Sequence, residues 1–199
     1  MINFLQKSKL NESKNSLTIT YPRTVDIIFG NYPYIDIINN LIIEIKNNLN
    51  SNLENYTNVK GKMTDWNYFL KDKNKNFYHF MSYIINQNQS AYPRMFEYFY
   101  EKNTILEAWG NKLEKGDSVS AHVHHHYHGI LYLTEGSDLE LPELNIKIKP
   151  SPGNYYIFPP EIVHKVNISE SEKTRYSLIF NIMLDSFAYE NKLKNGKES

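Results

Sequence analysis

The chain has no cysteine among its 199 residues. This absence excludes a disulfide framework and a thiolate metal site, so any metal must rest on histidine, carboxylate or water ligands. There is also no excess of charge, because 22 basic and 22 acidic side chains give a formal net charge of zero. The sequence therefore lacks the excess of basic residues that would indicate nucleic-acid binding. The sequence contains no run of about 18 apolar residues, so we expect no membrane span.

The first residues of the chain lack the long apolar run and the small-residue cleavage site of a secretory signal. Together with the missing membrane span, this predicts a cytoplasmic protein. Hydrophobic residues make up 41% of the sequence, and 16 tyrosines and 10 phenylalanines supply large side chains for a core. The length and this content favour one domain spanning residues 1–199.

The spacing of apolar residues divides the chain into two parts. In residues 17–103, an extended segment over 17–29 precedes a helical pattern at Ile38, Leu41, Ile42 and Ile45. Further helices are expected over 77–85 and 95–100. The segment 59–66, with two lysines and Trp66, could contact an anionic substrate, but it fits better a solvated turn around a buried tryptophan. We expect this N-terminal part to cover the sheet that follows and to build a substrate pocket.

In residues 104–183 short apolar runs alternate with turn residues, which is typical of an all-β sandwich or barrel. The expected strands are 105–111, 119–124, 130–134, 139–141, 145–149, 154–158, 163–167 and 175–183. Strands of this number and spacing predict a double-stranded β-helix, or jelly roll. The fold class is therefore mainly β with N-terminal helices, an α+β arrangement around a jelly-roll core.

Five of the seven histidines lie within residues 122–128, and a sixth, His164, follows 42 residues after His122. If the first stretch is a strand, residues two apart point to one face. That face would carry His122, His124, His126 and His128, and a distant strand would bring His164 to meet it.

Neutral imidazoles on one face favour a transition metal over magnesium or calcium. Three protein ligands with open positions are typical of a catalytic metal. We expect His122, His124 and His164 to bind the metal, and His126 and His128 to contact the substrate or to support the ligands. The alternative is a surface histidine tract that binds metal adventitiously. The mid-chain position of the cluster and its partner His164 favour an internal site.

Three short motifs resemble those of known jelly-roll families. Gly116, followed after five residues by His122-Val123-His124, resembles the first cupin motif. The segment 153–159 with His164 resembles the second cupin motif, although Glu161 stands where that motif has a glycine. Arg175-Tyr176-Ser177 resembles more closely the RxS motif of iron(II)/2-oxoglutarate oxygenases, which follows the distal ligand histidine at nearly the same spacing as here.

With Trp109 and Asn181 added, the set is similar to a group of 2-oxoglutarate oxygenases common in phage and marine bacterial genomes. The resemblance covers residues 105–183 and implies an iron-dependent dioxygenase, a hydroxylase that uses Fe(II) and 2-oxoglutarate. It implies that Arg175 grips the far carboxylate of the cosubstrate bidentately. The other implied roles are iron ligation by His122, His124 and His164, hydroxyl donation by Ser177 and Tyr132, and substrate contact or support by Trp109 and Asn181.

One departure from the oxygenase pattern leaves alternatives open. The usual facial triad has two histidines and one carboxylate, and here His124 stands at the carboxylate position. A cupin-type three-histidine metalloenzyme, a dioxygenase or isomerase that does not use 2-oxoglutarate, is the second hypothesis. A fourth ligand at His128 would favour it. The third hypothesis is a non-catalytic metal-binding jelly-roll module. The substrate is left open between a protein side chain, a nucleobase and a small molecule.

Overall fold

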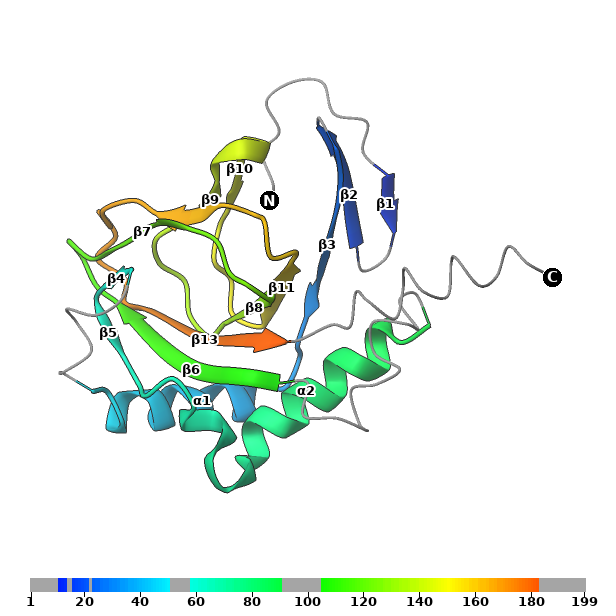
Figure 1. Ribbon diagram of the computed structural model, residues 1–199. Coiled ribbons are helices and arrows are strands. Elements are labelled where there is room, and N and C mark those ends of the chain that lie inside the picture. Colours follow the sequence, from blue (N-terminus) through cyan, green and yellow to red (C-terminus); the bar gives the residue numbers. More distant parts are fainter. Residues whose placement is uncertain (1–10, 14–15, 22, 51–57, 91–104, 183–199) are drawn as a thin grey trace.

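The computed structural model describes residues 11–13, 16–21, 23–50, 58–90 and 105–182. Two antiparallel sheets face each other, and two helices lie along the outer side of the larger one (Figure 1). The larger sheet has the strand order β1-β2-β3-β11-β8-β13-β6-β5, and the smaller has the order β10-β9-β12-β7-β4. This arrangement confirms the predicted mainly β jelly roll. The helix expected over 95–100 lies outside the described residues.

The larger sheet consists of β1 (Asn11–Ser13), β2 (Ser16–Tyr21), β3 (Arg23–Asn31), β5 (Lys62–Met63), β6 (Ile105–Leu113), β8 (Tyr127–Tyr132), β11 (Asn154–Phe158) and β13 (Arg175–Ile182). The smaller sheet consists of β4 (Val59–Lys60), β7 (Ser118–His122), β9 (Leu139–Leu141), β10 (Ile146–Ile148) and β12 (His164–Val166). The helices are α1 (Ile35–Asn47) and α2 (Lys75–Asn88), with the short 3-10 helices η2 (Tyr68–Lys73) and η3 (Pro142–Leu144).

Helix α1 forms where the sequence repeats apolar residues at helical spacing. Ile38, Leu41 and Ile45 lie on one face of α1, and all three are buried against the larger sheet. Helix α2 begins after Asn74, whose side-chain oxygen accepts a hydrogen bond from the backbone N–H of Phe77 at 3.0 Å. This cap satisfies one of the free N–H groups in the first turn of the helix.

The central strands β8, β11 and β13 of the larger sheet are buried on both faces, and their side chains alternate between two separate cores. Along β13, Leu178 and Phe180 point to the helices, whereas Ile179 points into the space between the sheets. Along β8, Leu131 faces the helices and Ile130 faces the interior. Along each of these strands, every second residue packs against the helices, and the residues between them line the inside of the jelly roll.

The histidine-rich stretch is not a single strand, which corrects the expected strand over 119–124 and the shared face of its four histidines. Strand β7 ends at His122 and β8 begins at Tyr127, so residues 123–126 form a loop between them. This loop crosses from the smaller sheet to the larger one, because β7 pairs with β4 and β12 whereas β8 pairs with β11 and β13. His128 consequently enters the interior from the sheet opposite His122.

Candidate metal centre

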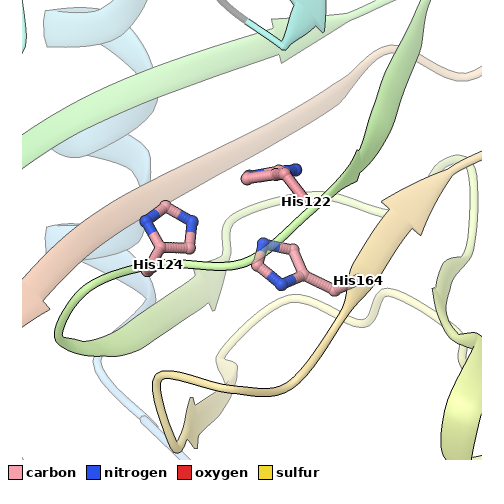
Figure 2. A group of neighbouring side chains, drawn as sticks. All are labelled: His122, His124 and His164. Carbon is pink, nitrogen blue, oxygen red and sulfur yellow. The ribbon is translucent and has the colours of Figure 1, made fainter.

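Three histidines converge between the two sheets (Figure 2). Their potential ligand atoms all lie within 4.8 Å of one another. His122 ends β7 and His164 begins β12, and these two residues are direct partners in the antiparallel ladder. His124 comes from the loop that follows β7. The structure therefore brings together the three residues that the sequence suggested as ligands.

The spacing of the three rings suits a shared metal. Ring centroids are 4.3 Å apart for His122 and His164, 5.0 Å for His122 and His124, and 5.1 Å for His124 and His164. Imidazoles bound to one ion through nitrogens about 2.1 Å from it have centroids roughly 4.5–5 Å apart. The donor set, three imidazoles without a thiolate or carboxylate, suits iron and its neighbours in the transition series.

Backbone carbonyls orient two of these rings. The Nδ1 atom of His122 lies 2.7 Å from the carbonyl oxygen of Ser120, and Nδ1 of His164 lies 3.0 Å from that of Ile162. A carbonyl oxygen only accepts, so each Nδ1 carries the proton and each Nε2 keeps its lone pair for a metal. The Nε2 atom of His124 is buried without a hydrogen-bond partner, as expected for a ligand atom.

The surroundings of the site keep its histidines neutral. Burial, followed by repulsion from neighbouring histidines, lowers the pKa of His124 to about 3 and that of His164 to about 4. Burial also lowers the pKa of His122. All three imidazoles are therefore unprotonated at neutral pH, which is the form that binds a metal.

His128 adjoins the three-histidine cluster and is held by a chain of hydrogen bonds. Its Nδ1 lies 3.0 Å from Oδ1 of Asn181, and Nδ2 of Asn181 donates to Oε2 of Glu107 at 2.6 Å. The ring of His128 is nearly parallel to those of His124 and His164, at 11° and 17°. His128 thus stacks on two candidate ligands, and it is not among the residues whose potential ligand atoms lie within 4.8 Å of one another.

A second polar cluster surrounds Arg175, at the first residue of β13. Arg175 is only 3% exposed, and its Nη1 donates to the carbonyl oxygen of Ser137 at 3.0 Å. Its Nε, the hydroxyl of Tyr132 and the hydroxyl of Ser177 are all buried without hydrogen-bond partners. Tyr132 and Ser177 are cross-strand partners, and the guanidinium lies 5.1 Å from the centre of the Tyr132 ring. Burial lowers the pKa of Arg175, while Tyr132 and Asp138 oppose that shift.

A cavity of about 470 Å³ connects the two clusters. Its wall includes the three converging histidines, and the other residues singled out from the sequence that line it are Trp109, His126, His128, Arg175 and Asn181. The lining also includes Trp66, Glu107 and Asn111, which were not among the predicted site residues. A sequence signal for two of them existed, because Glu107 and Asn111 alternate with Trp109 along β6 and share its inner face.

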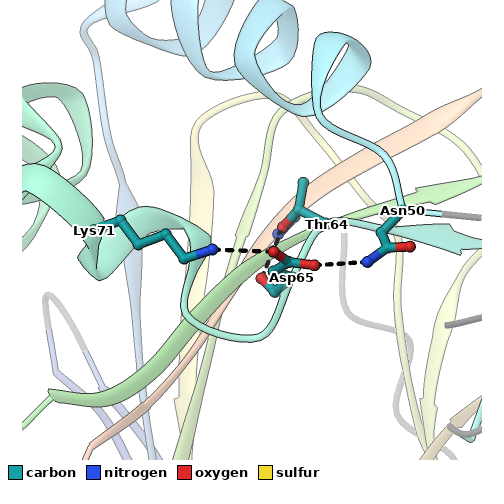
Figure 3. Close-up of polar contacts among 5 residues, drawn as sticks. Asn50, Thr64, Asp65 and Lys71 are labelled. Carbon is teal, nitrogen blue, oxygen red and sulfur yellow. Dashed lines mark hydrogen bonds and ion pairs between the residues drawn. The ribbon is translucent and has the colours of Figure 1, made fainter. Parts of the chain in front are cut away.

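Trp66 reaches the cavity because polar contacts fix the segment before η2 (Figure 3). Asp65 accepts hydrogen bonds from Asn50 at 2.7 Å and from Lys71 at 3.0 Å. The backbone of Thr64 and that of Trp66 bond to β6, at Gly110 and Ala108. The expected buried tryptophan is a wrong prediction, since Trp66 is 38% exposed.

No family model and no curated protein matches this sequence. Solved structures do match. A viral collagen prolyl hydroxylase from Paramecium bursaria Chlorella virus 1, in its 2-oxoglutarate complex, superposes with a TM-score of 0.60 at 12% identity, over 78% of this chain and 94% of that one. A prolyl-4-hydroxylase from Pseudomonas putida gives 0.57 at 14% identity, over 79% and 92%. The likeness shows a shared fold, and the finer resemblance to the phage and marine bacterial group stays a prediction.

Proposed function

We propose that this protein is a non-haem iron(II)/2-oxoglutarate-dependent oxygenase that hydroxylates an organic substrate. The observation that carries the proposal is the state of Arg175. Its guanidinium is buried at the wall of the cavity that holds the three histidines, and none of the ion pairs among the described residues includes it. Asp138 acts on Arg175 electrostatically but does not form an ion pair with it, and a buried cation without an ion-pair partner is costly, so the site favours an anionic ligand.

A 2-oxo dicarboxylate matches this arrangement at both of its ends. Its 2-oxo acid end would chelate a metal held by His122, His124 and His164, and its far carboxylate would pair with Arg175. The unpartnered hydroxyls of Tyr132 and Ser177 would complete the hydrogen bonds of that carboxylate. The fold shared with a viral hydroxylase solved as a 2-oxoglutarate complex supports this choice of ligand.

Iron(II), when bound together with 2-oxoglutarate, supplies the activation of dioxygen that hydroxylation of a C–H bond requires. The residues of this chain would exclude water from the metal position and orient its ligands. Ile130, Leu139 and Ile179 line the cavity with apolar surface, which excludes water from around the metal position. The carbonyls of Ser120 and Ile162 hold two of the ligand rings in a fixed orientation.

A three-histidine dioxygenase or isomerase that does not use 2-oxoglutarate is the second candidate. The presence of His124 where the facial triad has a carboxylate favours it. The absence of His128 from the group of convergent ligand atoms argues against the four-ligand form of this candidate. This candidate also gives no role to Arg175, which has no ion-pair partner, or to the unpartnered hydroxyls of Tyr132 and Ser177. A non-catalytic metal-binding module is the third candidate, and it gives these three groups no role either.

The deciding experiment is an anaerobic titration of the Fe(II)-loaded protein with 2-oxoglutarate, followed by the weak visible charge-transfer band of the chelate. We expect a band that appears and saturates. Bound iron without a band would overturn the proposal in favour of the second or third candidate. The same titration with succinate, which lacks the 2-oxo group, should give no band.

The variant Arg175→Met tests the role of the guanidinium while keeping most of its volume. We expect it to bind iron as the parent does and to need at least tenfold more 2-oxoglutarate for half-saturation, since a charge-assisted bidentate pair contributes roughly 1.5–3 kcal/mol. The matched control is Lys173→Met, which removes an exposed cation two residues away. Equal 2-oxoglutarate affinity in both variants would remove Arg175 from the cosubstrate site.

A further inference from the structure

The cavity carries one charged side chain of each sign in addition to its histidines. Arg175 supplies the positive charge and Glu107 the negative one. In the ladder between β6 and β13, Arg175 is opposite Leu113, whereas Glu107 is opposite Asn181. Six residues therefore separate the two positions along β13, which corresponds to roughly 20 Å of strand. The two charges lie toward opposite ends of the cavity wall.

Glu107 has no cationic partner in the part of the chain that the structure describes. Its Oε2 accepts a hydrogen bond from Asn181, and none of the ion pairs among the described residues involves it. Its side chain is partly buried. A carboxylate removed in part from water without a counter-ion is unfavourable unless a ligand supplies the opposite charge.

Two indole rings line the same cavity as this carboxylate. The carbonyl oxygen of Trp66 accepts a hydrogen bond from the backbone N–H of Ala108 at 3.0 Å, which fixes Trp66 next to Glu107. The Trp66 ring packs edge-on against Trp109, with centroids 4.7 Å apart. Trp66 lines the cavity and is 38% exposed, so a ligand can reach its ring. An accessible indole near a carboxylate is the combination that binds organic cations, and tryptophan is the strongest aromatic partner for them.

We infer that the substrate carries an ammonium or guanidinium group that binds between Glu107 and Trp66, while the carbon to be hydroxylated lies deeper, toward the three histidines. The substrate class is thus an organic cation of the lysine or arginine type. This inference rests on the proposed function, because only an enzyme would use the bound cation as a substrate. The cation site itself depends only on Glu107, Trp66 and Trp109.

The test is calorimetric binding of L-lysine and L-arginine to the Fe(II)-loaded protein under anaerobic conditions, with and without 2-oxoglutarate. Norleucine and citrulline are counterparts of nearly the same shape that lack the side-chain cation, and all four compounds share the α-ammonium group. We expect at least tenfold tighter binding of the cations than of the neutral compounds, as an ion pair reinforced by an indole provides. Equal binding of each charged and neutral pair, or binding of none of the four, would overturn the inference for free amino acids.

Blocked tripeptides with a central lysine or arginine, and their norleucine and citrulline equivalents, form the second arm. Tight binding of the peptides alone identifies a protein side chain as the source of the cation, and tight binding of the free amino acids identifies a small molecule. If neither arm separates charged from neutral compounds, the cation site does not exist.

The variant Glu107→Gln removes the charge and keeps an acceptor for Asn181. We expect it to lose the discrimination between charged and neutral compounds, and Trp66→Leu to weaken it. Glu143→Gln, which removes an exposed carboxylate on η3, is the control of equal net charge. Unchanged discrimination in Glu107→Gln would refute the site. Cation binding without the chelate band would refute only the proposed function, and the band without cation binding would refute only this inference.

Discussion

The imidazole rings of His124 and His128 lie face to face, with centroids 3.8 Å apart and planes 11° apart. A metal bound by an imidazole lies in the plane of that ring, because the nitrogen lone pair does. The lone pairs of two stacked, parallel rings therefore lie in separate planes. The stack supports His124, and His128 is not among the residues whose potential ligand atoms converge, so His122, His124 and His164 would hold a metal without it.

Replacement of His128 by glutamine is predicted to leave one iron bound per chain. The amide can keep a hydrogen bond to Asn181, and no coordinating atom is lost. We expect an iron affinity within about tenfold of the parent, the range of effects of groups that support a ligand. Competition with a coloured chelator measures it. Loss of the iron site in this variant would restore the four-ligand alternative.

Removal of a candidate ligand should have a larger effect. His122→Ala or His164→Ala is predicted to lower iron affinity by about a hundredfold or more, beyond the effect of losing a supporting group. The matched control is His79→Gln, because His79 bonds to Tyr32 on the helical side of the molecule and lies outside the cluster. Iron affinity that stays the same in all three variants contradicts the site.

The metal-free protein is predicted to lose stability as the pH falls from 7 to 4. The folded-state pKa of His124 is about 3 and that of His164 about 4, whereas the ordinary value is 6.5. Below pH 6.5 the unfolded chain gains protons that the folded chain does not take up, so the free energy of unfolding decreases. Urea unfolding of chelator-treated protein at pH 7 and pH 5 measures the change.

The double variant His124→Gln/His164→Gln provides the comparison for this pH dependence. It lacks two of the buried histidines that titrate differently in the folded and unfolded states, so its loss of stability over the same interval should be smaller. A parent protein that is equally stable at pH 5 and pH 7 would show that the buried imidazoles do not carry this linkage.

Two glycines allow a test of how tightly the larger sheet packs against the helices. A Cβ at Gly129 would lie 2.0 Å from Cζ of Phe180, whereas a Cβ at Gly116 would meet no atom within 4 Å. Gly129→Ala is predicted to lower the free energy of unfolding by roughly 1–3 kcal/mol through overpacking. Gly116→Ala should lower it by about 1 kcal/mol, because a φ of +89° is strained for alanine.

Denaturant unfolding compares the two glycine variants. The overpacked variant should lose the near-ultraviolet signal of its aromatic residues, since Phe180 must move, and the strained one should keep it. A Gly129→Ala protein as stable as the parent would mean that Phe180 has room to rotate away.

The strands that follow residue 104 were predictable because turn residues mark their ends. The strands expected over 139–141 and 154–158 match β9 and β11 residue for residue, and both are bounded by proline or glycine segments. The histidine stretch has no such punctuation. The loop consists of Val123 and three histidines, with no turn residue to mark it. The alternation typical of a strand was therefore predicted through a region where the chain in fact passes from one sheet to the other.

The missing parts of the site depend on contacts that no local pattern contains. Glu107 and Asn181 are 74 residues apart, and they meet only because β6 and β13 pair in one particular register. The position of Trp66 depends in the same way on backbone bonds to Ala108 across the edge of the sheet. The candidate ligands were easier to find, because histidine is scarce outside the cluster and its chemistry narrows the choice.

The pairing of His122 with His164 ties the chemistry of the protein to the accuracy of its folding. Strand β12 is only three residues long, and the ladder shifts register within it. A slip of one residue in such a short strand turns every side chain to the opposite face, so His164 would point away from His122. Only a correctly aligned chain presents the complete set of imidazoles, so metal binding at this site would require the native alignment. After loading with excess iron, the metal bound per chain would then report the fraction of chains that carry this alignment.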